Sequence, residues 1–411
     1  MKQSWEERRL KDIGITQTGT TPKTAEKNNY GDFIPFIKPA NIDIYNDGKV
    51  RYDNDGLSEK GLRAGRKMVE GSILMVCIGA TIGKVGYVDR DVSCNQQVNS
   101  LSVSKEFFPK FFYYALSTPS FYQQVMKNSA QATLPIINKK KWECLTVKYP
   151  KSLPEQQRIV AILDEAFAAI ANAKANAEQN LQNAKELFES YLQRVFENKD
   201  ADWEEKKLIE VCELNPRKKE ARDKLKETDY VTFLPMEDLG VLNKEIHGVK
   251  ERQLKDVAGS YTYFSENDVL LAKITPCFEN GKIGIGRNLI NGVGFGSSEY
   301  IVFRTKGNIK PEFLYYFLSR NQIRDEGKKY MSGAVGHKRV SKEWIENYRI
   351  PFPKSLKAQR AITQKLDYLS LEIKKLKVVY QSKIRNLEEL KKSILQKAFS
   401  GELTKTEVVA S

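Results

Sequence analysis

The sequence predicts an α+β protein in which two similar α/β domains are joined by two long antiparallel coiled-coil helices and related by a pseudo-two-fold axis. Three features predict this fold: repeated tryptophan segments, two mixed segments of similar pattern, and two long amphipathic stretches. Trp5 and Trp203 open similar segments, and Trp142 and Trp344 close similar segments. Their offset of roughly 200 residues far exceeds a solenoid repeat and indicates duplication of a whole domain.

The two mixed segments, residues 1–153 and 201–355, have the short apolar runs and polar punctuation that are typical of strands and turns. The predicted strands of the first segment are residues 33–37, 72–78 and 98–103. The second segment repeats this pattern, since residues 268–272 match residues 72–76. We therefore expect two globules with the same organisation.

The clearest helical pattern inside a globule is residues 109–126, and residues 311–316 of the second globule match its start. The aromatic residues here occur at helical spacing, which is more typical of a core than of base stacking. We expect the following aromatic residues to lie mostly in the two cores: Phe111, Phe112, Tyr113, Tyr114, Phe313, Tyr315 and Tyr316.

Two long helices are predicted at residues 154–200 and 356–401, followed by a C-terminal tail at residues 402–411. The first has apolar residues at heptad spacing and neither glycine nor proline after Pro154, and its run of about 42 residues predicts a rod of roughly 60 Å. The second starts similarly, with Gln359 and Arg360 matching Gln157 and Arg158. The positions expected to pack along the helices are Ile159, Leu163, Ile170, Ala177, Ala184 and Tyr191 in the first helix, and Ile362, Leu366, Leu369, Ile373, Leu376, Leu387 and Ile394 in the second.

Each long helix has an apolar stripe that needs a partner, because an isolated amphipathic helix leaves that stripe in water. Residues 154–196 contain four basic and six acidic residues (net −2), and residues 356–400 contain eleven basic and four acidic residues (net +7). Opposite charges favour pairing of the two helices with each other. The alternative is that each helix packs on a different protein.

The composition points to a polyanionic partner. Lys and Arg number 67 against 52 Asp and Glu, a formal net charge of +15, and nucleic acid is the commonest polyanion. No apolar run approaches the roughly 20 residues of a membrane helix, and the N-terminal residues do not resemble a signal peptide. The 5 cysteines are scattered, so we expect reduced thiols in a cytoplasmic protein, without disulfides or a zinc site.

Catalytic motifs are not evident. Residues 79–84 resemble a phosphate-binding loop, but one residue is missing between the glycines and Val85 stands where Ser or Thr would bind magnesium. His247 and His337 are the two histidines of the chain, and neither lies in a metal-binding pattern. We therefore expect no catalytic site, no metal and no cofactor in this chain.

Three segments carry a resemblance to a known family: the helix start at residues 153–160, the helix end at residues 395–404, and residues 79–84 followed by Asn95, Gln96 and Gln97. In these segments, and in the order of globule and helix over nearly the whole chain, the sequence closely resembles the specificity subunit of type I restriction–modification enzymes. The second copy departs from the first at residues 274–282 of its globule and at residues 357–360 of its long helix, as expected of two domains that read different sequences.

The resemblance implies a non-catalytic subunit whose globules are target recognition domains, each reading one half of a split site in double-stranded DNA. The helices would set the spacing of the halves, with half-sites about one helical turn, near 34 Å, apart. They would also dock two modification methyltransferase subunits, which carry S-adenosylmethionine and methylate adenine. Motor-nuclease subunits, which use ATP and Mg, would then join.

Candidate DNA contacts are polar or basic residues in loops, because hydroxyls and cations hold phosphates and side-chain amides can contact adenine in pairs of hydrogen bonds. The alternatives are ordinary turns, and buried amides that bond to the loop backbone. In the first globule the candidates are Thr18, Thr20, Thr21, Lys23, Lys38, Thr81, Lys84, Asn95, Gln96, Gln97 and Gln131. In the second they are Lys273, Thr275, Ser297, Ser298, His337, Lys338 and Arg339.

Two other interpretations remain open at this stage. The chain could be the specificity module of a related two-chain restriction enzyme, or an exchange copy that supports methylation alone. From a different class, it could be a coiled-coil scaffold whose globules bind protein, which predicts no salt-dependent affinity for DNA.

Overall fold

The computed structural model describes residues 5–43, 48–52, 55–130, 134–199, 201–248, 250–334 and 336–402. The chain divides into two compact units, of which the second is Glu178–Tyr380 and the first comprises the residues before and after it. Each unit therefore holds one globule and about half of each long helix, α5 (Leu153–Glu197) and α12 (Leu356–Phe399).

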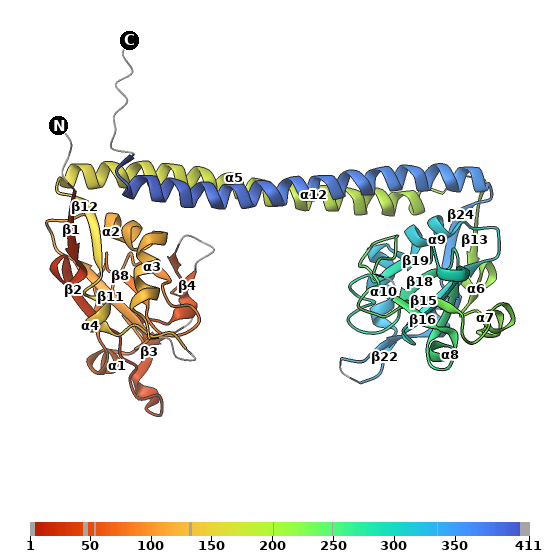
Figure 1. The fold of residues 1–411 in the computed structure, drawn as a ribbon, viewed down its shortest axis with the longest axis horizontal. Helices are drawn as coiled ribbons and strands as arrows, with labels where there is room; N and C mark the ends of the chain where they lie inside the picture. The colour runs from red at the N-terminus through yellow and green to blue at the C-terminus, as the bar shows by residue number, and fades with distance from the viewer. Residues whose placement is uncertain are drawn as a thin grey trace, which may run out of the picture. The chain divides into compact units, whose positions relative to one another are not determined.

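The first globule is built on two sheets and a two-stranded ribbon (Figure 1). The main sheet has the order β2 (Gly14–Thr18), β11 (Val98–Val103), β8 (Ile73–Val76), β9 (Val85–Tyr87), β5 (Lys49–Val50), β4 (Ile42–Asp43). The second sheet has the order β6 (Gly56–Leu57), β3 (Tyr30–Ile37), β10 (Val92–Cys94), β7 (Lys67–Met68). The ribbon pairs β1 (Trp5–Arg9) with β12 (Thr146–Pro150). The short helices are η1 (Leu10–Asp12), η2 (Lys27–Asn29), η3 (Pro39–Asn41), α1 (Glu59–Ala64), α2 (Pro109–Leu116), α3 (Pro119–Asn128) and α4 (Lys139–Trp142).

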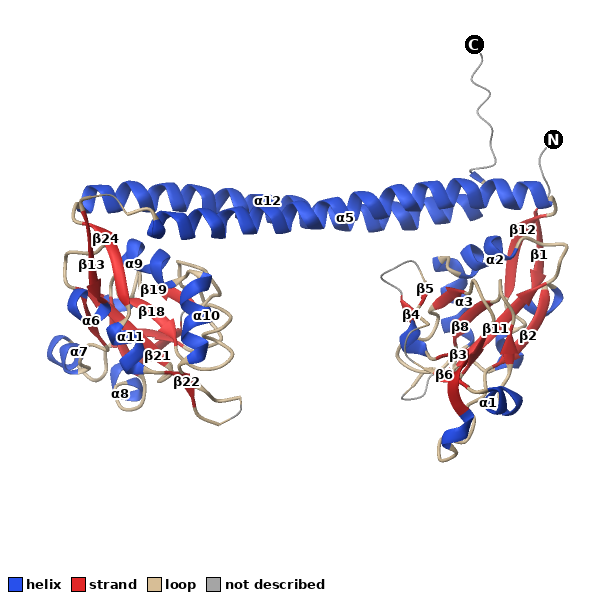
Figure 2. Ribbon diagram, turned by 180° about the vertical axis from the view of Figure 1, so that it is seen from behind, coloured by secondary structure: helices blue, strands red, loops and turns tan. Residues whose placement is uncertain are grey.

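The second globule repeats this plan (Figure 2). Its sheets have the orders β14 (Cys212–Leu214), β21 (Tyr300–Thr305), β18 (Val269–Ala272), β19 (Ile283–Ile285), and β16 (Lys250–Gln253), β15 (Tyr230–Leu234), β20 (Val293–Gly296), β17 (Thr262–Ser265). Its ribbon pairs β13 (Trp203–Lys207) with β24 (Arg349–Pro353), and β22 (Met331–Ser332) pairs with β23 (Arg339–Val340). The short helices are α6 (Leu208–Val211), α7 (Lys219–Lys224), α8 (Leu254–Val257), η4 (Ile290–Gly292), α9 (Pro311–Leu318), α10 (Asn321–Lys329) and α11 (Lys342–Asn347).

Strand register confirms the sequence duplication. Val98 pairs with Val76 between β11 and β8, and Tyr300 pairs with Ala272 between β21 and β18, so the match of residues 268–272 with 72–76 holds residue for residue. In both globules the second sheet contains one parallel pair, β3 with β10 and β15 with β20.

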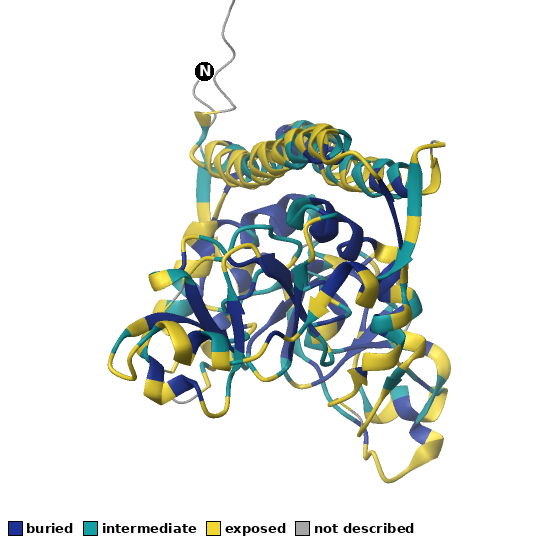
Figure 3. Ribbon diagram, turned by 90° about the vertical axis from the view of Figure 1, so that its right-hand side faces the viewer, coloured by how far each residue is buried: buried dark blue, intermediate teal, exposed yellow. Residues whose placement is uncertain are grey.

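The predicted helix at residues 109–126 is two helices, because α2 ends at Leu116 and Pro119 begins α3. Proline is tolerated in the first turn of a helix but lacks the N–H that a helix interior requires. The aromatic residues expected in the cores are buried there: Phe111, Phe112, Tyr113, Tyr114, Phe313, Tyr315 and Tyr316. Figure 3 shows buried residues concentrated in the sheets and exposed residues along the outer surfaces of the long helices.

A buried glutamine fixes the start of each long helix. Gln156 accepts a hydrogen bond from the Phe108 N–H and donates one to the Pro150 carbonyl, both at 2.9 Å. Gln359 likewise accepts from the Lys310 N–H at 2.8 Å and donates to the Pro353 carbonyl at 2.9 Å. The sequence match of Gln359 with Gln157 was therefore wrong by one residue.

The end of each long helix packs into the globule of its own unit. In the first unit the ring of Phe399, the last residue of α12, lies 5.1 Å from that of Phe111 and 6.4 Å from that of Trp5. In the second unit the ring of Phe196, near the end of α5, lies 5.1 Å from that of Phe313.

The two long helices pair antiparallel in the first unit, as predicted. Lys391 lies 4.8 Å from the ring centroid of Phe167, and Lys174 pairs with Glu388 at 2.8 Å. The residue numbers therefore increase along α5 in the direction in which they decrease along α12. In the second unit Lys365 lies 5.2 Å from the ring centroid of Tyr191.

The predicted packing positions differ in burial. Ile159, Leu163, Ile170, Ala177 and Leu366 are buried, and Leu376 is 38% exposed. The intermediate positions are Ala184, Tyr191, Ile362, Leu369, Ile373, Leu387 and Ile394. The buried positions nearest each helix start belong to the core of the adjacent globule, so one stripe contacts both the globule and the other helix.

Candidate nucleic-acid interface

In the first globule, the loops that follow β8, β10 and α3 meet at one end of the main sheet. The Cys77 N–H donates to the Gln97 carbonyl at 2.7 Å, and the Gly79 N–H donates to the Pro135 carbonyl at 3.1 Å. The Ile137 N–H donates to the Cys77 carbonyl at 3.0 Å, so Cys77 holds both other loops. The first loop edge is defined here as residues 77–84, 95–97 and 134–137.

The second globule makes the same three bonds between different residues. The Lys273 N–H donates to the Glu299 carbonyl, the Thr275 N–H to the Lys338 carbonyl, and the Val340 N–H to the Lys273 carbonyl, each at 2.9 Å. Backbone bonds impose little constraint on side-chain identity, so the edge can keep its shape while its chemistry changes. The second loop edge is defined as residues 273–282, 297–299 and 331–340, without residue 335.

Side-chain amides occupy the first loop edge, but Asn95 lies beneath the other two. Its Nδ2 donates to Gln97 Oε1 at 2.9 Å and its Oδ1 accepts from the Gln97 N–H at 3.2 Å, while only 8% of Asn95 is exposed. Gln96 is exposed and accepts a hydrogen bond from the Thr21 hydroxyl. The geometry therefore makes Gln96 and Gln97 available to a ligand and gives Asn95 an orienting role.

Residues 79–84 form the turn between β8 and β9. The N–H groups of Ile82, Gly83 and Lys84 donate to carbonyls of residues 79, 76 and 81, at 3.0, 2.8 and 3.2 Å. Gly79 and Gly83 have φ of +99° and +86°, a region that favours glycine. The segment is a tight turn, and the Thr81 side chain is exposed on it.

Two other predicted residues of the first globule lie next to this edge. The Thr20 N–H donates to the Cys94 carbonyl at 2.8 Å, which places Thr20 beside Asn95. Lys38 directly follows Ile37, whose carbonyl accepts from the Asn95 N–H at 3.0 Å. The Lys38 ammonium is paired with Asp55 at 2.8 Å.

Of the remaining candidates of the first globule, Lys84 lies at the end of the first loop edge, whereas Thr18 and Lys23 lie outside it. The Thr18 hydroxyl donates to Asn99 Oδ1 at 2.8 Å between β2 and β11, so its hydrogen is already used in a bond within the sheet. The Lys84 ammonium donates to the Ile42 carbonyl at 3.4 Å, and Lys23 is exposed in the segment between β2 and η2. Gln131 lies outside the described residues.

The second loop edge is charged. Arg339 makes two hydrogen bonds to the Glu299 carboxylate, Nε at 2.9 Å and Nη2 at 2.6 Å. Lys273 donates to the Ser298 carbonyl at 2.8 Å and its ammonium lies 4.0 Å from Glu299. The Arg339 hydrogen bonds, followed by the charges of Lys273, Arg339 and His337, hold the pKa of Glu299 below its usual value.

The hairpin of β22 and β23 carries exposed polar and basic side chains of this edge. His337, Lys338 and Arg339 are exposed, and the His337 N–H donates to the Ala334 carbonyl at 2.9 Å in the hairpin loop. Ser298 is exposed, whereas Ser297 accepts from the Glu299 N–H at 3.2 Å and Thr275 is half-buried. The loop edge thus brings together all the candidates of the second globule.

The family model for the type I restriction modification DNA specificity domain matches residues 2–182 and again residues 200–379. The chain belongs to this family.

Individual relatives agree. The type I restriction enzyme EcoAI specificity subunit of Escherichia coli is 31% identical over 224 residues, which cover 54% of this chain but only 36% of that protein. The MjaIX specificity subunit of Methanocaldococcus jannaschii is 22% identical over 418 residues, which cover 97% of this chain and 93% of the relative. A solved chain of a type I R-M system has the same fold, with a TM-score of 0.74 at 17% identity, over 96% of this chain and 97% of that one.

Sequence reasoning missed two features of these specificity domains. Glu299 was not singled out, although its place in the duplication is that of Gln97, one of the predicted residues. Tyr330 is 55% exposed and its ring stacks on Trp344 at 5.7 Å with an interplanar angle of 19°, next to the β22–β23 hairpin. Among the described residues, no group of three or more His, Cys, Asp or Glu side chains is arranged to bind a metal ion.

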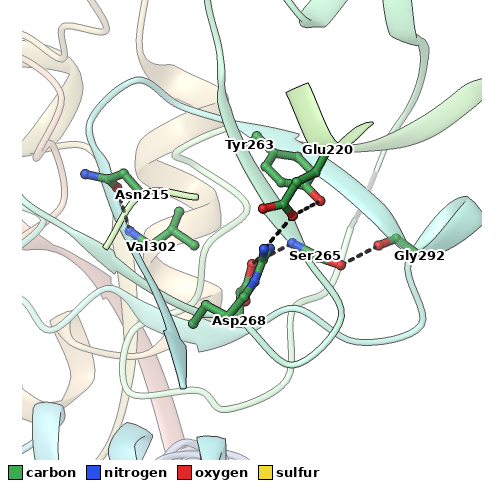
Figure 4. A network of polar contacts seen from close by, with 8 residues as sticks. Asn215, Glu220, Tyr263, Ser265, Asp268, Gly292 and Val302 are labelled. Atoms are coloured by element: carbon green, nitrogen blue, oxygen red, sulfur yellow. Dashed lines mark hydrogen bonds and ion pairs between the residues drawn. The ribbon is translucent and has the colours of Figure 1, made fainter. Parts of the chain in front are cut away.

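An ionic network around the buried Asp268 supports the second specificity domain from the opposite end of β18. Arg304 on β21 makes hydrogen bonds of 2.9 and 2.7 Å to Asp268 and one of 2.6 Å to Glu220 on α7 (Figure 4). Asp268 is 1% exposed, and this burial raises its pKa, although Arg304 acts in the opposite direction. In the first domain the equivalent residues are Ser72 and Ser102, whose hydroxyls lie 2.8 Å apart.

Proposed function

We propose that this chain is the non-catalytic subunit that gives a type I restriction–modification complex its DNA sequence specificity. Each globule reads one half of a two-part target in double-stranded DNA, and α5 and α12 set the spacing of the halves. The observation that carries this proposal is the pair of loop edges, which share backbone hydrogen bonds but present amides in one globule and charges in the other.

The side chains of the loop edges suit different bases. Gln96 and Gln97 can each pair with the N6 and N7 groups of adenine in the major groove. Arg339 can form two hydrogen bonds to guanine, and Glu299, which already holds it at two nitrogens, fixes its orientation. Phosphates beside these base readers would be held by Thr20, Thr21, Thr81, Lys338 and His337.

The long helices also supply a surface for partner proteins. On α12, Tyr368, Leu371 and Val378 are 62%, 51% and 65% exposed, and their spacing puts them on one side of the helix. Exposed apolar residues gathered on one face mark interaction sites. We propose that two methyltransferase subunits dock on the long helices and bring S-adenosylmethionine for adenine methylation.

Motor-nuclease subunits, with ATP and Mg, would join that core complex, and the assembly would act in the cytoplasm, where these partners meet DNA. The membrane is not a proposed partner, and among the helices that the structure describes none is long and apolar enough to span one.

The test is selection from a random duplex library by the full chain together with its methyltransferase. The expected result is a two-part target with a fixed gap, and an affinity whose logarithm falls by about 0.9 per phosphate contact for each unit of log salt. Selection of one contiguous site would contradict the proposal. A protein-binding scaffold predicts instead that no DNA is retained in a salt-dependent manner, even with the methyltransferase present.

A further inference from the structure

A cavity of about 240 Å³ lies in the first unit between α2, α3, the β1–β12 ribbon and the last turn of α12. Ala115, Thr118, Phe121 and Phe399 are among its lining residues, and Glu7 lines it from the ribbon. Its volume is below the roughly 300–1,000 Å³ of pockets that bind small molecules. The size suits one protein side chain.

In the second unit two large side chains, Phe317 and Arg320, occupy the equivalent place. The equivalence of α2 with α9 and of Phe399 with Phe196 makes Phe317 the counterpart of Ala115 and Arg320 the counterpart of Thr118. Arg320 is 6% exposed, and its guanidinium lies 4.3 Å from the ring centroid of Phe317 and 4.9 Å from that of Phe196.

Polar contacts hold the Arg320 guanidinium in this apolar setting. Its Nε donates to the Phe317 carbonyl at 3.2 Å and its Nη1 donates to Gln322 Oε1 at 3.3 Å. Burial lowers the pKa of Arg320 to about 10, which leaves it charged at neutral pH, while Glu326 and Glu197 favour the charge.

The first unit retains the groups that would receive such a cation. Phe399 supplies the aromatic ring in place of Phe196, and Ser120 stands where Gln322 accepts a hydrogen bond. The Glu7 carboxylate lines the cavity and accepts from the Thr146 hydroxyl at 2.5 Å, which leaves its second oxygen for a further donor. Lys148, which pairs with Glu7 across the β1–β12 ribbon, also lines the cavity and opposes a cation, and both side chains are exposed.

We propose that this cavity is a socket for an arginine side chain that a partner protein inserts. The second globule fills the place with its own Arg320, whereas the first globule leaves it for an arginine supplied by another chain. The guanidinium stacks on Phe399 and donates to Glu7 and the Ser120 hydroxyl. An occupant would join the globule to the last turn of α12, because Phe399 and Ala115 both line the cavity.

The inference rests on the proposed function only in identifying the partner as a subunit of the same assembly. The binding itself requires neither DNA nor that subunit, so it can be tested separately. An arginine side chain is favoured over an apolar one because it can donate to the Glu7 carboxylate and the Ser120 hydroxyl while its guanidinium packs on the Phe399 ring.

The test is titration of the full chain, labelled at alanine and threonine methyl groups, with N-acetyl-L-arginine amide. The methyl resonances of Ala115 and Thr118 are expected to shift and saturate, while N-acetyl-L-lysine amide and N-acetyl-L-phenylalanine amide bind at least 10-fold more weakly. Free L-arginine distinguishes a metabolite from a side chain. If it binds 10-fold more tightly than the blocked amide, the side-chain proposal is overturned.

Two variants make the outcome decisive. Thr118→Arg copies the second globule and should weaken the probe at least 10-fold, with Thr24→Arg, an exposed position on the same globule, as the charge-matched control. Arg320→Thr should create a second probe site in the second unit. If Thr118→Arg does not fold, Ala115→Phe fills the same cavity. Unchanged probe affinity in a folded cavity-filling variant, or equal binding of the lysine amide, would overturn the proposal.

Discussion

The two globules share the same fold and the same contacts with the long helices, and they differ at side chains that the shared fold does not constrain. Asp164 bonds to the Tyr114 hydroxyl at 2.5 Å and, in the second unit, Asp367 bonds to the Tyr316 hydroxyl at 2.6 Å. These contacts tie each long helix to its globule. In contrast, Ser72 and Ser102 in one sheet are replaced by an ion pair in the other.

The difference teaches where a duplicated domain can diverge. Positions that hold the long helices are constrained by burial and by backbone partners, as Gln156 and Gln359 show at 0% exposure. Positions on the loop edges are held mainly through their backbone, so their side chains can change without loss of the fold. Interior positions can change only in matched sets, because a lone buried charge is costly.

The largest expected effect comes from breaking the matched set in the second globule. Arg304→Ser leaves the buried Asp268 carboxylate without its cation and should destabilise the second unit by about 3–5 kcal/mol. The double variant Asp268→Ser/Arg304→Ser, which copies the first globule, should lose less than half as much. Hydrogen exchange read separately in the two units checks this, and a double variant as unstable as the single one would contradict matched divergence.

The same variant predicts a pH dependence. Burial raises the pKa of Asp268, and removing Arg304 removes a group that lowers it. A carboxyl with a raised folded-state pKa favours folding at low pH and opposes it as pH rises through that pKa. The penalty of Arg304→Ser should therefore shrink as the pH falls below that pKa, and a penalty that grows with acidity would refute this account.

A smaller effect, similar in the two copies, is expected from the helix-start glutamines. Gln156→Leu removes the partner of the Phe108 N–H and the Pro150 carbonyl, and Gln359→Leu removes that of the Lys310 N–H and the Pro353 and Asn308 carbonyls. Each change should cost about 2–4 kcal/mol in the affected unit. Urea unfolding measures the loss, and the exposed neighbour Gln157→Leu is the control, expected within about 0.5 kcal/mol. A large loss of stability in only one unit would contradict the claim that the two glutamines have the same structural role.

Next in size is the effect of the second loop edge on DNA selection. Arg339→Ala should reduce affinity for the selected target by about 1–3 kcal/mol and relax one base position in the second half-site only. Lys338→Ala should weaken all sequences alike and reduce the salt slope by about 1. Library selection with each variant makes the comparison. If sequence selection relaxed in the first half-site instead, the assignment of the second loop edge to the second half-site would be wrong.

The smallest effect is expected between the long helices. Glu388→Gln removes the pair with Lys174 and should change the stability of the first unit by no more than about 1 kcal/mol, since this pair is partly solvated. The loss should diminish with added salt. A loss of several kcal/mol that salt does not reduce would show that ion pairing, rather than apolar packing, holds the helices in this unit.

Much of the fold could be predicted because its signals are local or repeated. The tryptophan pairs, the match of residues 72–76 with 268–272 and the proline at the start of α2 and α9 all lie in contiguous sequence. The break at Pro119 was missed because the apolar pattern continues across it. The one-residue error at Gln157 arose because two adjacent glutamines look alike until one is seen to bond to Pro150.

The candidate site was predictable only in part. Loop composition pointed to Gln96, Lys273 and Arg339, but it could not separate exposed amides from Asn95, which bonds inward. Nor could it reveal Glu299, because the importance of that residue comes from holding Arg339 across 40 positions of sequence.

The sequence by itself determined the duplication, the alternation of globule and long helix, the excess of positive charge and the family to which the chain belongs. These are properties of spacing and composition, which exist before the chain folds. Only the tertiary structure decided which loops meet, which polar groups are already bonded, and where one globule has a cavity that the other fills with Arg320. Those outcomes depend on contacts between distant segments, whose energies depend on burial and distance and are not written in any local pattern.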